Sequence, residues 1–378
     1  MSAACCTSAE VAMVIDQRGA RRAAEVRSVA RPYWKRGAQT VQPSPGTRRE
    51  SSRGGTCAPA RYMVVPPVAS GKRGHHGDVP VLGVWKGRRM AEPSPDVEHA
   101  PARTATVGDI EVRYDTFGNQ ADPTMLLIMG MGFQLIHWPP DFCRELAAEG
   151  LRVVRFDNRD AGRSTHLPGR RYRLEDMAAD SIGLLNALGI PSAHVVGASM
   201  GGMIAQTIAI RYPDRVRSLG SLMSTTGRRG VGRTSPHVFR YALGRRPRTA
   251  QEAVERRVRV FAAIGSPGFD QDLDELRTVT ALAFERDPDA RDARRRQHRA
   301  VRASADRTQA LGKLTVPTVV IHGTHDLMCH PSGGQATADA VPGAQLQLIQ
   351  GMGHDLPRGA WPRILESIIK NAARSDEP

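Results

Sequence analysis

The residues best suited to chemistry in this 378-residue chain lie in the pentapeptide Gly197-Ala-Ser199-Met-Gly201. An apolar run typical of a strand precedes it, and a sequence with helical spacing follows it. A serine on such a tight turn presents its hydroxyl at the carboxyl edge of a sheet, and the flanking glycines allow the sharp turn. The helix start also directs free N–H groups at developing negative charge. We therefore expect Ser199 to be a nucleophile.

A serine nucleophile needs a base, and the base needs a group that orients it. His354 lies in a loop just after one predicted strand, and Asp326 lies just after another, so both belong at the same edge of the sheet as Ser199. The chain order serine, aspartate, histidine is the one used by hydrolases with this turn. Asp355 adjoins His354 and would have to strain to reach its ring. We predict a catalytic set of Ser199, Asp326 and His354.

Attack on a carbonyl also requires donors for the oxyanion that forms. The turn at Ser199 supplies the backbone N–H of Met200. The second donor is expected from the glycine-flanked turn Met129-Gly-Met131-Gly132, where side chains would block the approach of a substrate. We therefore predict the N–H groups of Met131 and Met200 as the oxyanion donors.

Apolar residues after this turn are candidates for a substrate pocket. They are Phe133, Ile136 and Trp138. Packing in the core or exposure on a loop would explain the same residues equally well, so all three interpretations stay open. Phe133 and Trp138 are the substrate-binding residues that we predict.

Elements that could position these residues begin near Thr104, where short apolar segments alternate with amphipathic ones. The expected strands are 106–107, 110–117, 125–129, 151–156, 194–197, 216–223, 318–323 and 345–349. The expected helices are 141–149, 177–188, 201–211, 334–340 and 361–373. This alternation is typical of an α/β fold, and we predict a mostly parallel eight-stranded sheet with helices on both faces.

Residues 226–310 interrupt the alternation. Charge-rich helical segments, 250–263 and 273–286, follow one another there without a strand between them. We interpret this stretch as a helical lid inserted over the sheet. The catalytic core would then comprise 101–225 and 311–378.

Residues 1–100 are rich in Arg, Gly, Pro, Ser and Ala, and they contain too little apolar surface to offset the entropy of ordering. We predict a disordered basic extension. A sharper hypothesis is that the native protein begins at Met90. Intact-mass measurement tests it, and a mass that includes residues 1–89 would contradict it.

The formal net charge of +15 could suggest a nucleic-acid partner. The charge is concentrated in residues 1–89, at +11, and 226–310, at +8, so the rest of the chain is mildly acidic. Only five of the 53 basic residues are lysines, which indicates a coding bias toward arginine rather than a phosphate-binding surface. We expect no nucleic-acid partner.

Five scattered cysteines form no disulfide framework, which favours a reducing compartment. No secretory leader or long apolar stretch is evident, so we expect a cytoplasmic protein with no membrane partner. Cys329-His330 near Asp326 lacks a further ligand at a recognisable spacing, and we expect neither metal nor cofactor. The sequence leaves the oligomeric state open.

From about Thr104 onward the chain resembles the α/β-hydrolase superfamily. The runs Met129–Gly132, Phe156–Ser164 and Gly197–Gly202 are similar to those of the serine hydrolase branch that contains aclacinomycin methylesterase and related bacterial esterases. The resemblance implies the same serine, aspartate and histidine as the triad. The sequence departs from the common pattern in two places. Met129 stands where His is usual, and Leu-Met-Cys-His follows Asp326.

These residues together predict hydrolysis of a small-molecule carboxylic ester through an acyl-enzyme intermediate. Serine at the nucleophile position argues against haloalkane dehalogenase and epoxide hydrolase activity, which use aspartate. A lactonase, a cofactor-free perhydrolase or a carbon–carbon bond hydrolase would use the same triad. A ligand-binding receptor with little turnover is an alternative from a different class.

Overall fold

The computed structural model describes residues 97–242, 247–288 and 290–375. All of them lie within one compact unit, Leu82–Pro378. The predicted disorder of residues 1–100 falls almost entirely outside the described residues, and so does the hypothesised start at Met90. The first strand begins at His99, just inside that range.

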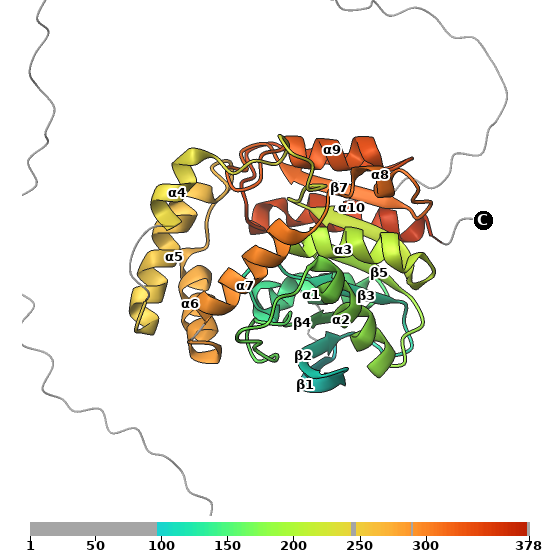
Figure 1. Ribbon diagram of the computed structural model, residues 1–378, viewed down its shortest axis with the longest axis horizontal. Coiled ribbons are helices and arrows are strands. Elements are labelled where there is room, and N and C mark those ends of the chain that lie inside the picture. Colours follow the sequence, from blue (N-terminus) through green and yellow to red (C-terminus); the bar gives the residue numbers. More distant parts are fainter. Residues whose placement is uncertain (1–96, 243–246, 289, 376–378) are drawn as a thin grey trace, which may run out of the picture. The chain divides into compact units, whose positions relative to one another are not determined.

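Eight strands form a single mostly parallel sheet, as predicted (Figure 1). They are β1 (His99–Val107), β2 (Ile110–Phe117), β3 (Thr124–Ile128), β4 (Arg152–Phe156), β5 (Ala193–Ala198), β6 (Val216–Leu222), β7 (Thr318–Gly323) and β8 (Gln345–Ile349). Their order across the sheet is β1-β2-β4-β3-β5-β6-β7-β8. The β1–β2 and β2–β4 pairs are antiparallel, and every other pair is parallel. The carboxyl ends of β3 and β5 to β8 therefore meet at one edge.

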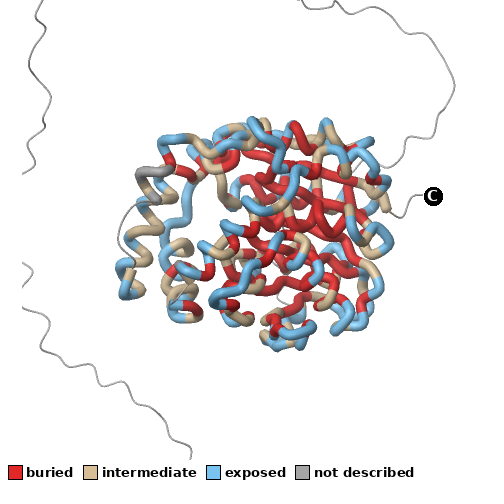
Figure 2. The backbone as a smooth tube through the Cα atoms, in the orientation of Figure 1, coloured by how far each residue is buried: buried red, intermediate tan, exposed pale blue. Residues whose placement is uncertain are grey.

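Helices cover both faces of this sheet because side chains alternate between the faces along each strand. Met125 and Leu127 of β3 pack in one apolar cluster with α1 (Pro140–Ala148) and α10 (Trp361–Ala373). The alternate residues Leu126 and Ile128 pack in a second cluster with α2 (Leu174–Ala187) and α3 (Met200–Arg211). Figure 2 shows these layers as the most buried part of the unit. The remaining core helix, α9 (Ser332–Ala340), contacts β7 and β8.

A helical insertion, defined here as α4 to α8, separates β6 from β7. It comprises α4 (Pro236–Ala242), α5 (Ala250–Ile264), α6 (Leu273–Arg286), α7 (Ala290–Ala303) and α8 (Thr308–Leu311). Figure 1 shows α4, α5 and α6 beside the sheet and α7 leading back to it. The predicted segments 250–263 and 273–286 correspond to α5 and α6.

Buried ion pairs join this insertion to the loop after β4. The Asp157 carboxylate, fully buried, accepts hydrogen bonds from Arg286 of α6 at 2.5 Å and from the backbone N–H of Leu135 at 2.7 Å. Asp160 likewise pairs with Arg296 of α7. These contacts give the loop after β4 a structural role. Within the described ranges, no helix combines the length and apolarity needed to cross a bilayer.

Candidate active site

Ser199 lies on a strained turn between β5 and α3. Its φ of 57° and ψ of −119° are rare for a residue with a side chain, and its N–H donates to the Leu222 carbonyl oxygen at 2.9 Å. The neighbouring glycines permit this turn. A Cβ atom at Gly197 would lie 2.1 Å from the Gly201 oxygen, and one at Gly201 would lie 2.0 Å from the Ile128 oxygen. Backbone packing therefore requires glycine at both positions.

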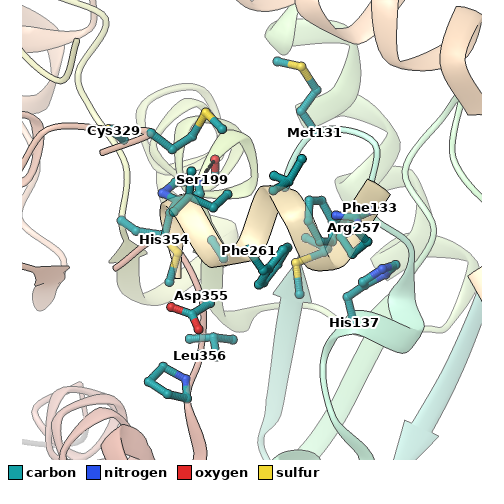
Figure 3. A pocket seen from close by; sticks show the side chains of 18 of the residues that line it. Met131, Phe133, His137, Ser199, Arg257, Phe261, Cys329, His354, Asp355 and Leu356 are labelled. Carbon is teal, nitrogen blue, oxygen red and sulfur yellow. Dashed lines mark hydrogen bonds between the residues drawn. The ribbon is translucent and has the colours of Figure 1, made fainter. Parts of the chain in front are cut away.

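Three side chains from three strand ends form one chain of hydrogen bonds. His354, in the loop after β8, lies with Nε2 3.0 Å from Ser199 Oγ (Figure 3). Its Nδ1 lies 2.7 Å from Asp326 Oδ2. A carboxylate only accepts, so Nδ1 carries the proton and Nε2 is free to accept one from the hydroxyl. The structure thus brings together all three residues predicted as catalytic. Such an arrangement can deprotonate a serine hydroxyl.

The Asp326 carboxylate is fully buried and held by several donors. Its Oδ1 accepts the N–H groups of Met328 at 2.9 Å and Cys329 at 2.8 Å. Burial raises the pKa of Asp326, but the charge of His354 and hydrogen bonds from His322 and His354 lower it more. The net pKa lies well below its usual value. Asp326 is therefore ionised throughout the neutral range.

His322 is a second histidine at this carboxylate, and the sequence analysis did not identify it. Its Nε2 donates to the Cys329 carbonyl oxygen at 2.7 Å and lies 3.3 Å from Asp326 Oδ2. The side chain is fully buried in β7. The only feature of the sequence that could have indicated this contact is the position of His322 four residues before Asp326. Strand residues at that spacing usually serve packing.

The loop after β3 lies against Ser199, where an oxyanion would form. A Cβ atom at Gly130 would be 3.1 Å from that of Ser199, so the backbone itself borders the hydroxyl. Gln297 of α7 fixes this loop by accepting the Gly132 N–H at 2.8 Å. In the described part of the chain, no protein acceptor pairs with the backbone N–H of Met131 or Met200.

The helical insertion also holds the loop that carries His354. The His354 N–H donates to the Ile264 oxygen at 2.8 Å, and the Gly353 N–H donates to Ser266 Oγ at 2.8 Å. The Ser266 hydroxyl in turn donates to Asp355. Asp355 is therefore hydrogen-bonded to the segment after α5, while Asp326 is the carboxylate that accepts from Nδ1 of His354.

A cavity of about 1490 Å³ opens above Ser199 and His354. Phe133 and Ile136 line it, together with residues of α5 and α6. Trp138 does not, which corrects the sequence-based expectation. Its side chain is fully buried and stacks on Phe142 of α1 at 5.7 Å, because the chain has already turned into the core there.

A sheet of this strand order, with serine, histidine and aspartate joined at its carboxyl edge, defines the α/β-hydrolase class. The model of the alpha/beta hydrolase fold family matches residues 123–357, and the chain belongs to this family.

Several known proteins are similar to this chain. Rhodomycin D methylesterase DauP from a Streptomyces species is 29% identical over 278 residues, covering 68% of this chain and 93% of that protein. The 3-oxoadipate enol-lactonase 2 of Acinetobacter baylyi is 26% identical over 247 residues, covering 65% and 88%. The solved structure of a putative lipase from Acinetobacter baumannii superimposes with a TM-score of 0.61 at 18% identity, covering 73% of this chain and 92% of that one.

Proposed function

We propose that this protein hydrolyses small-molecule carboxylic esters through an acyl-enzyme intermediate on Ser199. The observation that carries the proposal is the continuous hydrogen-bond chain from Ser199 through His354 to Asp326. The family membership supports it, because the relatives named above include a methylesterase and an enol-lactonase. Both names describe hydrolysis of an ester bond.

In the first half of the reaction, His354 Nε2 takes the hydroxyl proton as Ser199 Oγ attacks the carbonyl carbon. The backbone N–H groups of Met131 and Met200 bind the oxyanion. Collapse of the tetrahedral intermediate breaks the ester bond, and His354 gives its proton to the leaving alcohol. Water then enters, loses a proton to His354 and releases the acid by the same route. Asp326 stabilises the imidazolium in both halves.

A lactonase is a second candidate. The chemistry is identical, since a lactone is a cyclic ester whose alcohol stays attached to the acyl group. The named enol-lactonase among the relatives favours this alternative. In either case we propose that the helical insertion acts as the lid over the substrate, because α5 and α6 line the cavity.

The direct test uses short p-nitrophenyl esters. We expect Ser199→Ala to lower kcat by about 10⁴ to 10⁶, because the nucleophile is lost. Ser367→Ala, at a half-buried serine of α10 that does not line the cavity, is the control and should match the wild type. A fluorophosphonate probe should also add its mass to the peptide containing Ser199. Equal turnover by wild type and Ser199→Ala would refute the mechanism and favour a receptor.

A further inference from the structure

The cavity contains a cation that the proposed hydrolysis does not use. Arg257 of α5 projects into it between two aromatic rings, with its guanidinium carbon 4.5 Å from the centroid of Phe133 and 5.7 Å from that of Phe261. Figure 3 shows these three side chains grouped together and Ser199 beside His354 in another part of the same cavity. The guanidinium thus faces the space in which a substrate would lie.

Arg257 differs in its partners from the other arginines of the insertion whose side chains are largely buried. Arg307 donates to the Gln206 side-chain oxygen and to the Thr225 carbonyl oxygen. Arg286 and Arg296 each pair with a buried aspartate. Among the described residues, no carboxylate pairs with Arg257, and the aromatic rings are its close contacts. Burial, followed by the charges of Arg294 and Arg256, lowers the pKa of Arg257 to about 10. The surroundings of this cation therefore disfavour its charge.

A half-buried cation without a counter-ion costs free energy, because its hydration is lost and no protein charge replaces it. Stacking on two rings offsets part of that cost. A leucine or methionine at this position would pack against the same rings without the cost. The neighbouring His137 adds no charge of its own, because burial and the Arg257 charge lower its pKa to about 3. An anion that enters with the substrate would remove the imbalance.

We propose that Arg257 binds a carboxylate group of the substrate, at a distance from the bond that Ser199 cleaves. The planar guanidinium matches a carboxylate with two parallel hydrogen bonds. Phe133 and Phe261 would enclose an apolar or aromatic segment next to it. The cavity volume of about 1490 Å³ is larger than that of ordinary small-molecule pockets, which is about 300–1,000 Å³. The cavity therefore has more space than a short ester fills. The proposal deepens the function proposed above and rests on it for the cleavage step.

The test compares substrates that differ only in the distal charge. p-Nitrophenyl monoesters of dicarboxylic acids, from glutarate to sebacate, are each paired with the uncharged straight-chain ester of equal length. We expect the wild type to prefer the carboxylate at one or more chain lengths. Arg257→Gln should lower kcat/KM for that ester about 10- to 100-fold, mainly through KM, as loss of a charged hydrogen bond predicts. Turnover of the uncharged ester should stay within about threefold.

Matched controls separate binding from folding. Arg259→Gln removes an exposed charge from the same helix and should change neither ester. Arg257→Met removes the charge but keeps the contact with both rings, so it replaces the glutamine variant if that one folds poorly. A wild type without any preference for carboxylates would overturn the proposal. Equal losses on both ester types in Arg257→Met would do the same.

A binding measurement distinguishes failure of this inference from failure of the proposed function. Suberate should bind the Ser199→Ala protein in calorimetry, and the added Arg257→Met substitution should weaken binding at least about tenfold. That result would support the carboxylate site even if no ester were hydrolysed. Suberate binding that is independent of Arg257, in a protein that does hydrolyse uncharged esters, would refute the site and leave the esterase standing.

Discussion

Asp326 keeps its charge in a fully buried position because neighbouring groups donate to both of its oxygens. Two backbone N–H groups fix Oδ1, while His354 and His322 approach Oδ2. The low pKa that results keeps the carboxylate a pure acceptor, which in turn fixes the proton of His354 on Nδ1. The tautomer of the base is therefore set by Asp326 and by the groups that hold its carboxylate.

This dependence predicts the effect of Asp326→Asn. An asparagine can turn its amide N–H toward Nδ1, which would move the proton to Nε2 and leave no acceptor for the serine hydroxyl. We expect kcat for p-nitrophenyl esters to fall by about 10³ to 10⁴. Asp355→Asn is the control, because Asp355 is bound by Ser266, and we expect less than about tenfold loss. A larger loss in Asp355→Asn than in Asp326→Asn would reverse the assignment.

The helices of the insertion contain little core of their own. Ile264 is the only buried residue described in α5, and Thr280 is the only one described in α6. Figure 2 shows these helices mostly in the colours of intermediate and exposed residues. Their attachment to the sheet therefore depends on polar contacts such as the pair between Arg286 and Asp157. Burial raises the pKa of Asp157 in spite of Arg286, so this carboxylate depends strongly on its partner.

Removal of that partner should destabilise the protein. We expect Arg286→Met to lower the free energy of unfolding by about 3–5 kcal/mol, because it leaves the Asp157 charge buried and unpaired. Arg277→Met on the same helix breaks an exposed pair with Asp274 and should cost less than about 1 kcal/mol. Urea unfolding measures both values. Similar losses in the two variants would show that the buried pair does not anchor α6.

At the scale of the whole molecule, one histidine contributes to the loss of folding stability at acid pH. His137 has a pKa of about 3 in the folded protein, chiefly because it is buried, against about 6.5 in an unfolded chain. Between these values the unfolded state binds a proton that the folded state does not. Stability must therefore fall as the pH falls from about 6.5 toward 3.

A substitution at His137 isolates this proton. In His137→Gln, the free energy of unfolding should decline less steeply below pH 6.5 than in the wild type. The difference in slope should approach about 1.4 kcal/mol per pH unit, the value for one proton. Urea unfolding between pH 7.5 and 4.5 measures the two slopes. Parallel curves would show that His137 takes up its proton without unfolding.

Much of this architecture follows from local patterns. Most strands and core helices agree with the prediction to within a few residues, because apolar periodicity and glycine-rich turns are properties of neighbouring positions. The exception is β1, which begins at His99 and not at residue 106. Trp138 was misplaced because an aromatic residue after a loop has the same appearance in a pocket and in a core. His322 and Arg257 were missed because their roles arise from contacts with Asp326 and Phe133, distant in sequence.

The junction between Ile264–Gly268 and Gly351–His354 constrains how such an enzyme can be re-engineered or diversify. Hydrogen bonds at this junction hold His354 in position. A foreign insertion grafted between β6 and β7 would therefore have to reproduce that short segment, or it would misplace the imidazole ring of His354. The rest of α5 and α6 is not constrained in this way. Specificity can therefore change elsewhere in the insertion while residues 264–268 keep His354 in place for the chemistry.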